Sequence, residues 1–258
     1  PSAGIETTTG PLGQGFSNAV GMALAERLLK ASFGDGLVNH YTYVFCGDGC
    51  LMEGITHEAA SLAGHLGLSN LIVFFDNNNI TIDGRTDLSV SEDTLARFQA
   101  YGWETLAIDG HDHQQIFNAI TMARANDKPT LISCRTTIGY GSPSKQNTAG
   151  IHGSPLGAEE TKATRENLNW PYGPFEIPDD LLNLWRYAYQ PHLEAYEQWQ
   201  ENFAQLDLES RKEFENRMTG ELPVGWTDHI FLKIKTYCDL KPNQATRKSS
   251  GELIEALM

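Results

Sequence analysis

Short apolar segments alternate with helical patterns between residues 41 and 135, and this alternation constrains the fold more than any other feature of the sequence. Segments rich in Val, Ile, Leu and aromatic residues are typical of strands covered on both faces, and they occupy residues 41–46, 70–76 and 130–135, with a weaker candidate at 103–108. Helical patterns fill 53–66 and 112–126. The alternation predicts an α/β fold, a doubly wound parallel sheet flanked by helices.

Helical patterns also occur in the sequence before the first and after the last predicted strand. Residues 15–30 predict a helix that places Gly15, Ala19 and Ala23 on one face, a spacing that permits close packing against a neighbour. After residue 155 we expect a C-terminal helical extension and a linker, with helices over 179–205 and 208–218, a connector with short structure over 223–248 and the start of an amphipathic helix at 251–258. The first residue opens into a glycine-rich loop and this last helix runs to the final residue, so we expect an interior segment of a longer protein.

Charge and composition narrow the class of partner. The formal net charge of −14 opposes binding to nucleic acid, because a polyanion is repelled by the summed field. The sequence has no apolar run long enough to cross a bilayer and no charged-then-apolar leader, so we expect a cytoplasmic chain with no membrane partner. The four cysteines form no CxxC pair, which favours reduced thiols. His111 and His113 flank a predicted helix cap and are expected at the surface.

A glycine turn, Gly-Asp-Gly at residues 47–49, joins the first predicted strand to a helix. Turns of this kind let backbone N–H groups approach a phosphate at the carboxyl edge of a sheet. A dinucleotide site is the main alternative, because Asp76 could hold a ribose, but the glycines do not have the G-x-G-x-x-G spacing. Asp48 inside the turn would also repel a bare pyrophosphate by on the order of several kcal/mol. A divalent cation between the carboxylate and the pyrophosphate turns this repulsion into attraction.

The end of the next predicted strand supplies further oxygen ligands for such a cation. Asn78 follows Asp48 by 30 residues, a separation that one helix and one strand bring back to the same edge of the sheet. One carboxylate, one amide oxygen, a backbone carbonyl and two phosphate oxygens, completed by water, form an octahedral shell that suits Mg²⁺. Ca²⁺ would fit less strictly.

Gly-Asp-Gly followed after about thirty residues by Asn resembles the fingerprint of thiamine diphosphate enzymes. In that family the metal is held by the Asp and Asn side chains and by the carbonyl two residues after the Asn. The resemblance therefore implies that Asp48, Asn78 and the carbonyl of Ile80 are the metal ligands, and that the fold is the thiamine diphosphate-binding fold.

Further segments resemble transketolases in particular: 7–15 (Thr-Thr-Thr-Gly-Pro-Leu-Gly-Gln-Gly), 47–55, 80–84, 137–143 and 152–157. The resemblance implies that the cofactor is bound by Gly10, Leu12, Gly49, Asn78, Ile82, Ile138 and His152. Gly10 and Leu12 would face the aminopyrimidine and thiazolium through their backbone, and Ile82 and Ile138 would form an apolar wall beside the thiazolium. His152, near the diphosphate and the substrate's hydroxyl groups, is the expected catalytic residue, because a neutral imidazole exchanges protons near physiological pH.

The implied activity is transfer of a two-carbon ketol group from a ketose phosphate to an aldose phosphate, a step of the pentose phosphate pathway. Glu53 and Glu58 match acidic residues of the family's homodimer interface network, although Glu53 could equally stabilise the start of a helix by its charge. A dihydroxyacetone synthase shares most of these motifs and stays open. A split subunit or interaction module without turnover is the non-enzyme alternative.

The resemblance also implies a division of the chain into domains. Residues 1–222 would be a diphosphate-binding domain that lacks its N-terminal part and includes a helical extension at 155–222. Residues 223–258 would be a linker and the first helix of a pyrimidine-binding domain. The glutamate that activates the aminopyrimidine and the groups that hold sugar phosphate belong, in the family, to parts outside this sequence. We therefore expect the isolated chain to be inactive and to need a pyrimidine-binding domain from the same or another chain.

Overall fold

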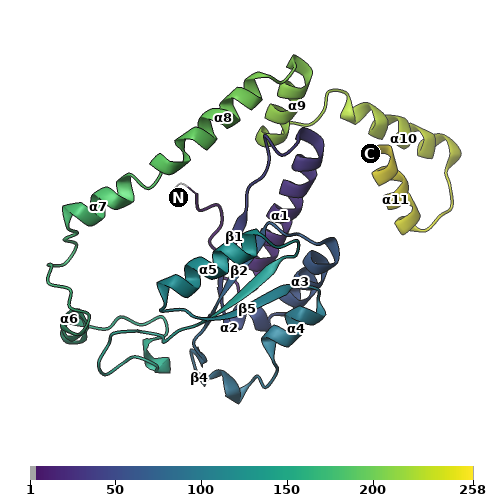
Figure 1. Ribbon diagram of the computed structural model, residues 1–258. Helices are drawn as coiled ribbons and strands as arrows, with labels where there is room; N and C mark the ends of the chain where they lie inside the picture. Colours follow the sequence, from purple (N-terminus) through teal and green to yellow (C-terminus); the bar gives the residue numbers. More distant parts are fainter. Residues whose placement is uncertain (1–3, 258) are drawn as a thin grey trace. The chain divides into compact units, whose positions relative to one another are not determined.

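The computed structural model describes residues 4–257 (Figure 1), and the chain divides into two compact units, Pro1–Leu193 and Glu194–Met258. The first unit holds the sheet and the second is helical. In the part of the chain that the structure describes, no helix is both long enough and apolar enough to cross a bilayer.

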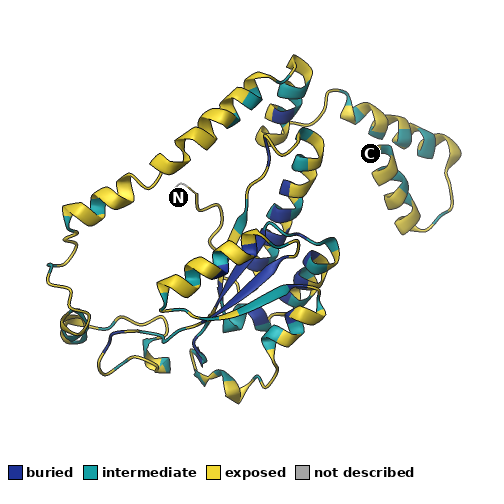
Figure 2. Ribbon diagram, in the orientation of Figure 1, coloured by how far each residue is buried: buried dark blue, intermediate teal, exposed yellow. Residues whose placement is uncertain are grey.

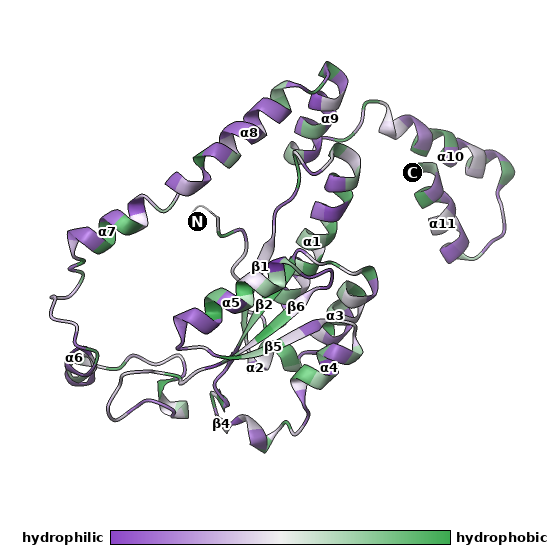
Figure 3. Ribbon diagram, in the orientation of Figure 1, coloured by the Kyte–Doolittle hydropathy of each residue, from purple (hydrophilic) through white to green (hydrophobic). Residues whose placement is uncertain are grey.

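Four parallel strands form the sheet of the first unit, in the order β1 (Thr42–Gly47), β2 (Leu71–Asn77), β6 (Thr130–Arg135) and β5 (Glu104–Asp109). The two central strands are almost wholly buried (Figure 2). Hydrophobic residues run along both strands (Figure 3). The parallel sheet flanked by helices is therefore confirmed, including the strand that the sequence indicated only weakly.

One face of the sheet is covered by three helices, α1 (Gln14–Phe33), α3 (Gly54–Leu66) and α4 (Thr94–Ala100). Small residues allow close approach here: Ala19 and Ala23 on α1 are buried, as the spacing predicted. At Gly64 on α3 an added Cβ would overlap the carbonyl oxygen of Tyr101, so the backbones of α3 and the residue after α4 nearly touch. This close contact fixes α3 and α4 relative to each other.

The other face of the sheet is covered by α5 (His113–Arg124), which packs on alternate residues of β2 and β6. Beside it lies an open apolar groove of about 990 Å³, lined by Tyr43, Phe45 and Phe74 among others. Phe45 is 82% exposed and stacks on Phe74 with ring centroids 5.0 Å apart.

Several short elements complete the first unit. They are α2 (Asp48–Met52), β3 (Ile80–Thr81), β4 (Gly84–Arg85), η1 (Thr86–Leu88), η2 (Ala149–Ile151), α6 (Ala158–Asn167), α7 (Asp179–Arg186) and η3 (Gln190–His192). The helix expected over 53–66 is α3, with Glu53 as its N-cap residue in an extended backbone conformation, whereas the preceding helix α2 was not predicted. The glycine turn runs directly into α2.

The second unit consists of α8 (Leu193–Ala204), α9 (Leu208–Thr219), α10 (Trp226–Leu240) and α11 (Thr246–Leu257). The single helix predicted over 179–205 is wrong, because η3 interrupts it at Pro191, which lacks a backbone N–H. Residues 226–240 form a helix of 15 residues where a connector with only short structure was expected. A 2.6 Å hydrogen bond from the Tyr237 hydroxyl to Glu252 and a 3.3 Å ion pair between Lys233 and Glu252 join α10 to α11.

All four cysteines are free. Cys46 on β1 and Cys134 on β6 are buried, and Cys50 packs against the core from α2. Burial raises the pKa of the Cys134 thiol to about 11 and that of Cys46 further. Cys238 on α10 is exposed. Cys46 and Cys50 thus fill space in and around the core.

Candidate functional site

The register of β1 and β2 brings the two predicted metal-binding segments to one edge of the sheet. Gly47, the last residue of β1, lies opposite Asp76 on β2. Asp48 follows as the first residue of α2, and Asn78 follows two residues after Asp76. Because parallel neighbours end at the same edge, both side chains start from adjacent backbone positions. The separation of 30 residues thus corresponds to one helix and one strand, as expected.

The carboxyl group of Asp48 is half-buried beside a second carboxylate. Burial raises its pKa to about 6, and the charge of Asp76 adds to the rise, while a backbone hydrogen bond and the Arg135 guanidinium act in the opposite direction. A desolvated carboxylate next to a like charge favours any bound cation, which replaces the lost solvation of its charged form. The electrostatics at the glycine turn therefore suit a cation.

Asn78 is held in one orientation. It is 8% exposed, and its Nδ2 donates to Asp76 Oδ2 at 3.4 Å while its Oδ1 accepts from the backbone N–H of Ile80 at 2.9 Å. Asn79 between them has a left-handed backbone with φ 61°. Asp76 is fixed in turn by a short hydrogen bond from the Thr136 hydroxyl. An amide oxygen has two lone pairs, so Asn78 Oδ1 keeps one for a metal.

These donors fit a hard cation that shares its shell with phosphate. In residues 4–257 no group of three or more His, Cys, Asp or Glu side chains could hold a metal alone. The predicted set comprises the Asp48 carboxylate, the Asn78 amide oxygen and the Ile80 carbonyl, three oxygens in all. Mg²⁺ characteristically takes few protein ligands and completes its octahedron with phosphate oxygens and water. The residues present therefore fit a metal and diphosphate together.

The glycine-rich loop before α1 lies against the turn. A Cβ added at Gly49 would stand 3.0 Å from Leu12 Cδ1, and one at Gly13 would stand 2.8 Å from Glu53 Cβ. Gly13 also has φ 77°, which favours glycine. The loop that carries Leu12 is therefore seated on the junction of α2 and α3. Gly10, further along the same loop, is exposed and has open space around it.

The remaining predicted residues are less enclosed. Ile138 is half-buried and lines the open groove together with Gly47 and Asp76. Ile82, in the connection between β3 and β4, is 69% exposed, and His152, just after η2, is also exposed. The structure thus brings Ile138 to the glycine turn, whereas the positions of Ile82 and His152 give no enclosed wall.

The two predicted interface carboxylates are both exposed. Glu53 stands at the N-cap of α3 without a side-chain capping bond, and Glu58 lies one turn further along the same helix. Both are free to face another surface.

Sequence reasoning missed the groups that hold the segment from 137 to 157. Glu160 on α6 accepts hydrogen bonds from Ser142 Oγ, from Ser144 N at 2.8 Å and from Ser144 Oγ at 2.7 Å, and these bonds lower its pKa to about 2. His111 Nε2 accepts from Thr137 N at 3.0 Å. An acidic residue in the first turn of a helix was the only available signal for Glu160.

Comparison with known proteins agrees with this geometry. The family model described as the thiamine diphosphate binding domain of transketolase matches residues 1–223. The chain belongs to the transketolase family. It is 50% identical over 260 residues to transketolase 2 of Vibrio parahaemolyticus, and 49% identical over 261 residues to transketolase 1 of Pasteurella multocida. Relatives that carry the transketolase name do not favour a dihydroxyacetone synthase.

Solved transketolases have the same fold. The transketolase of Leishmania mexicana matches with a TM-score of 0.82 and 42% identity, over 87% of this chain and 35% of that one. A transketolase of Pichia stipitis in complex with sedoheptulose 7-phosphate matches with a TM-score of 0.81 and 42% identity, over 87% of this chain and 34% of that one. Both bacterial relatives are matched over 98% of this chain, which spans 39% of their length.

Proposed function

We propose that this chain forms the diphosphate-and-metal half of a thiamine diphosphate site in a transketolase. The Asp48 carboxylate, the Asn78 amide oxygen and the Ile80 carbonyl hold Mg²⁺, or Ca²⁺, against the cofactor's diphosphate. The observation that carries the proposal is the β1–β2 register, Gly47 opposite Asp76, which starts Asp48 and Asn78 from adjacent positions. The desolvated Asp48 carboxyl supports it, because it is electrostatically unbalanced without a cation.

The reaction we propose is transfer of a two-carbon ketol group between sugar phosphates in the pentose phosphate pathway. Thiamine diphosphate would supply the electron sink for breaking and forming the carbon–carbon bond. The backbone at Gly10, Leu12 and Gly49 positions the cofactor. Ile82 and Ile138 supply apolar surface beside its ring that the pyrimidine-binding domain would enclose, and His152 exchanges a proton with the substrate's hydroxyl side.

Sugar phosphates are supported as the substrate class by the solved relatives. Transketolase of Pichia stipitis has been solved with xylulose 5-phosphate, with fructose 6-phosphate and with sedoheptulose 7-phosphate. Ketose phosphates of this kind are the donors that we propose here, with an aldose phosphate as acceptor.

The assembly that we propose is a cytoplasmic homodimer in which a pyrimidine-binding domain completes the site. Glu53 and Glu58 belong to its carboxylate network, and their exposure on α3 supports this. Residues 1–222 are the diphosphate-binding domain and 223–258 the linker and first helix of the next. Because the relatives are matched over only 39% of their length, we expect no turnover from the 258 residues alone.

Calorimetric titration with thiamine diphosphate tests the half-site. We expect binding that requires Mg²⁺, is lost in EDTA and weakens at least about tenfold in Asp48→Asn, the scale of one lost charged contact. Asp87→Asn is the matched control, since Asp87 is exposed and pairs only with Arg85 among the described residues. Binding that is independent of metal, or equal in both variants, would contradict the metal site.

A transketolase assay with xylulose 5-phosphate and ribose 5-phosphate tests the need for a second domain. We expect no steady turnover from the isolated chain and restored turnover when a pyrimidine-binding domain is supplied. Turnover by the chain alone would show that the half-site suffices. Binding of the added domain without turnover would instead support a non-catalytic split subunit or interaction module.

A further inference from the structure

The helix that carries Asp48 and Gly49 is too short to be stable by its own hydrogen bonds. α2 contains five residues, Asp48–Met52, and helices of this length are unstable alone because nucleation costs more than one turn of hydrogen bonds returns. Its last carbonyl groups have no partners within the helix. Whatever binds those carbonyls therefore sets the direction in which α2 presents Asp48.

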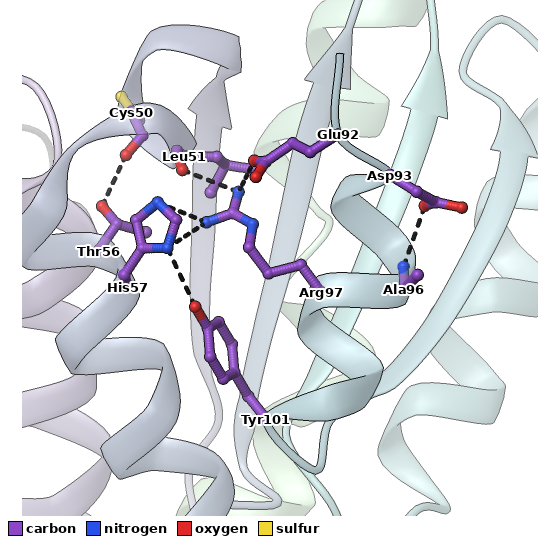
Figure 4. A network of polar contacts seen from close by, with 9 residues as sticks. All are labelled: Cys50, Leu51, Thr56, His57, Glu92, Asp93, Ala96, Arg97 and Tyr101. Carbon is purple, nitrogen blue, oxygen red and sulfur yellow. Dashed lines mark hydrogen bonds and ion pairs between the residues drawn. The ribbon is translucent and has the colours of Figure 1, made fainter. Parts of the chain in front are cut away.

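Two side chains from neighbouring helices bind these carbonyls (Figure 4). Thr56 on α3, which is fully buried, donates from Oγ1 to the carbonyl of Cys50 at 2.6 Å. Arg97 on α4 donates from Nη2 to the carbonyl of Leu51 at 2.9 Å. The second contact joins residues 46 positions apart in sequence, so α2 is tied to α4 as well as to α3.

Arg97 is itself fixed on three sides. Nη2 pairs with Glu92 Oε1 at 3.0 Å, and Nη1 lies 2.9 Å from His57 Nε2 and 3.0 Å from His57 Nδ1. The Tyr101 hydroxyl lies 3.0 Å from His57 Nδ1. The side chain of Arg97 is only 12% exposed. A planar guanidinium with its donors in a rigid fork keeps this geometry where a lysine cannot.

Arg97 also borders the same space as the metal carboxylate. A polar cavity of about 280 Å³ is lined by both Asp48 and Arg97, together with Asn77 and Asn79 from the second metal-binding segment. The guanidinium thus binds the carbonyl end of α2, while Asp48 at the other end of the same helix lines the cavity. None of the contacts between the described residues joins Arg97 directly to Asp48, Asn78 or Ile80.

We infer that Arg97 is a positioning residue for the cofactor site: through the Leu51 carbonyl it holds α2 in the orientation that presents Asp48 and Gly49 to metal and diphosphate. Glu92 and His57 orient Arg97, and Thr56 provides the second tie. The role towards the cofactor rests on the proposed function. The tie between Arg97 and α2 does not.

Hydrogen exchange read by mass spectrometry tests the tie without any ligand. In Arg97→Met we expect the amides of residues 48–52 to exchange about tenfold faster, as expected for loss of one charged hydrogen bond, with β1 and β2 unchanged. Arg124→Met is the matched control, because it removes an exposed arginine from the last turn of α5. Unchanged exchange in α2, or a uniform rise over the whole unit, would overturn the inference.

Titration of the same variants with Mg²⁺ and thiamine diphosphate tests the consequence. We expect affinity to fall about tenfold in Arg97→Met, to fall less in Arg97→Lys, which keeps the charge, and to stay at the wild-type value in Arg124→Met. Faster α2 exchange with affinity within twofold of wild type would overturn the positioning role.

Two further results are distinguishable. If the wild-type chain binds no cofactor, the proposed function fails. Hydrogen exchange of the α2 amides still decides whether Arg97 holds α2. If Arg97→Met does not fold, Arg97→Lys decides: wild-type exchange in residues 48–52 overturns the inference, and faster exchange there supports it.

Discussion

The two parts of the proposed site are built in different ways. Asp48 and Asn78 follow paired strands, and their neighbours are fixed by the β-ladder and by buried hydrogen bonds. The segment that carries Ile138 and His152 has only the three-residue η2 and is held largely by side chains such as Glu160. A position set by a ladder cannot move without breaking the sheet, whereas the loop can adjust when a few contacts change.

The largest expected effect comes from a substitution in the helices that support the part of the site with Asp48 and Asn78. Gly64→Ala places a methyl group on the Tyr101 carbonyl oxygen and should lower the free energy of unfolding by about 3 kcal/mol, because backbone atoms cannot give way. Gly21→Ala, at an exposed position of α1 with open space around it, should raise the free energy of unfolding by about 0.5–1 kcal/mol. Urea denaturation of both variants measures the difference, and equal stabilities would show that the contact of α3 with Tyr101 is not rigid.

A second experiment compares the two parts directly by cofactor affinity. Asn78→Ala removes a predicted metal ligand and two hydrogen bonds, so the affinity for Mg²⁺ and thiamine diphosphate should fall about thirtyfold. His152→Ala should change it by about threefold at most, because an exposed imidazole contributes little contact. Calorimetry gives both values. A reversed order would mean that the loop closes on the cofactor even in this chain.

A smaller effect should be confined to the loop. Glu160→Gln weakens the charge-assisted bonds from Ser142 and Ser144. We expect faster hydrogen exchange across residues 142–146, and unchanged exchange in β1 and β2. Glu159→Gln, one residue away and exposed, is the control. A rise that spreads to the strands would remove the distinction drawn between the two parts.

The smallest expected effect is a shift of one pKa. Hydrogen bonds lower the Glu160 pKa from 4.5 to about 2, so its stabilisation of the loop is complete above pH 4.5 and is lost as pH falls through about 2. Ser144→Ala removes the hydroxyl bond and should move the pKa back towards 4.5. Carbon-detected NMR titration of the Glu160 carboxyl measures it. An unchanged pKa would mean that Ser144 contributes nothing.

The strands, and the placement of Asp48 and Asn78 at one edge of the sheet, were predictable because their information is local or follows from one register. Apolar strand sequences identify the sheet, and neighbouring parallel strands end together. α2 was missed because five residues show no periodicity, and the break before α8 because Pro191 lies inside a continuous amphipathic pattern. Contacts such as Arg97 with His57, 40 residues apart, depend on packing between helices, which sequence spacing alone does not give.

The unequal burial of the cysteines makes the chain convenient to label. A maleimide attacks a thiolate, so Cys46 and Cys134, buried and with raised thiol pKa, should resist it while the protein is folded. Cys238 is exposed on α10, well away along the chain from every predicted ligand. A fluorophore attached there would report on the helical unit, and additional labelling of Cys46 and Cys134 would occur only when the sheet opens.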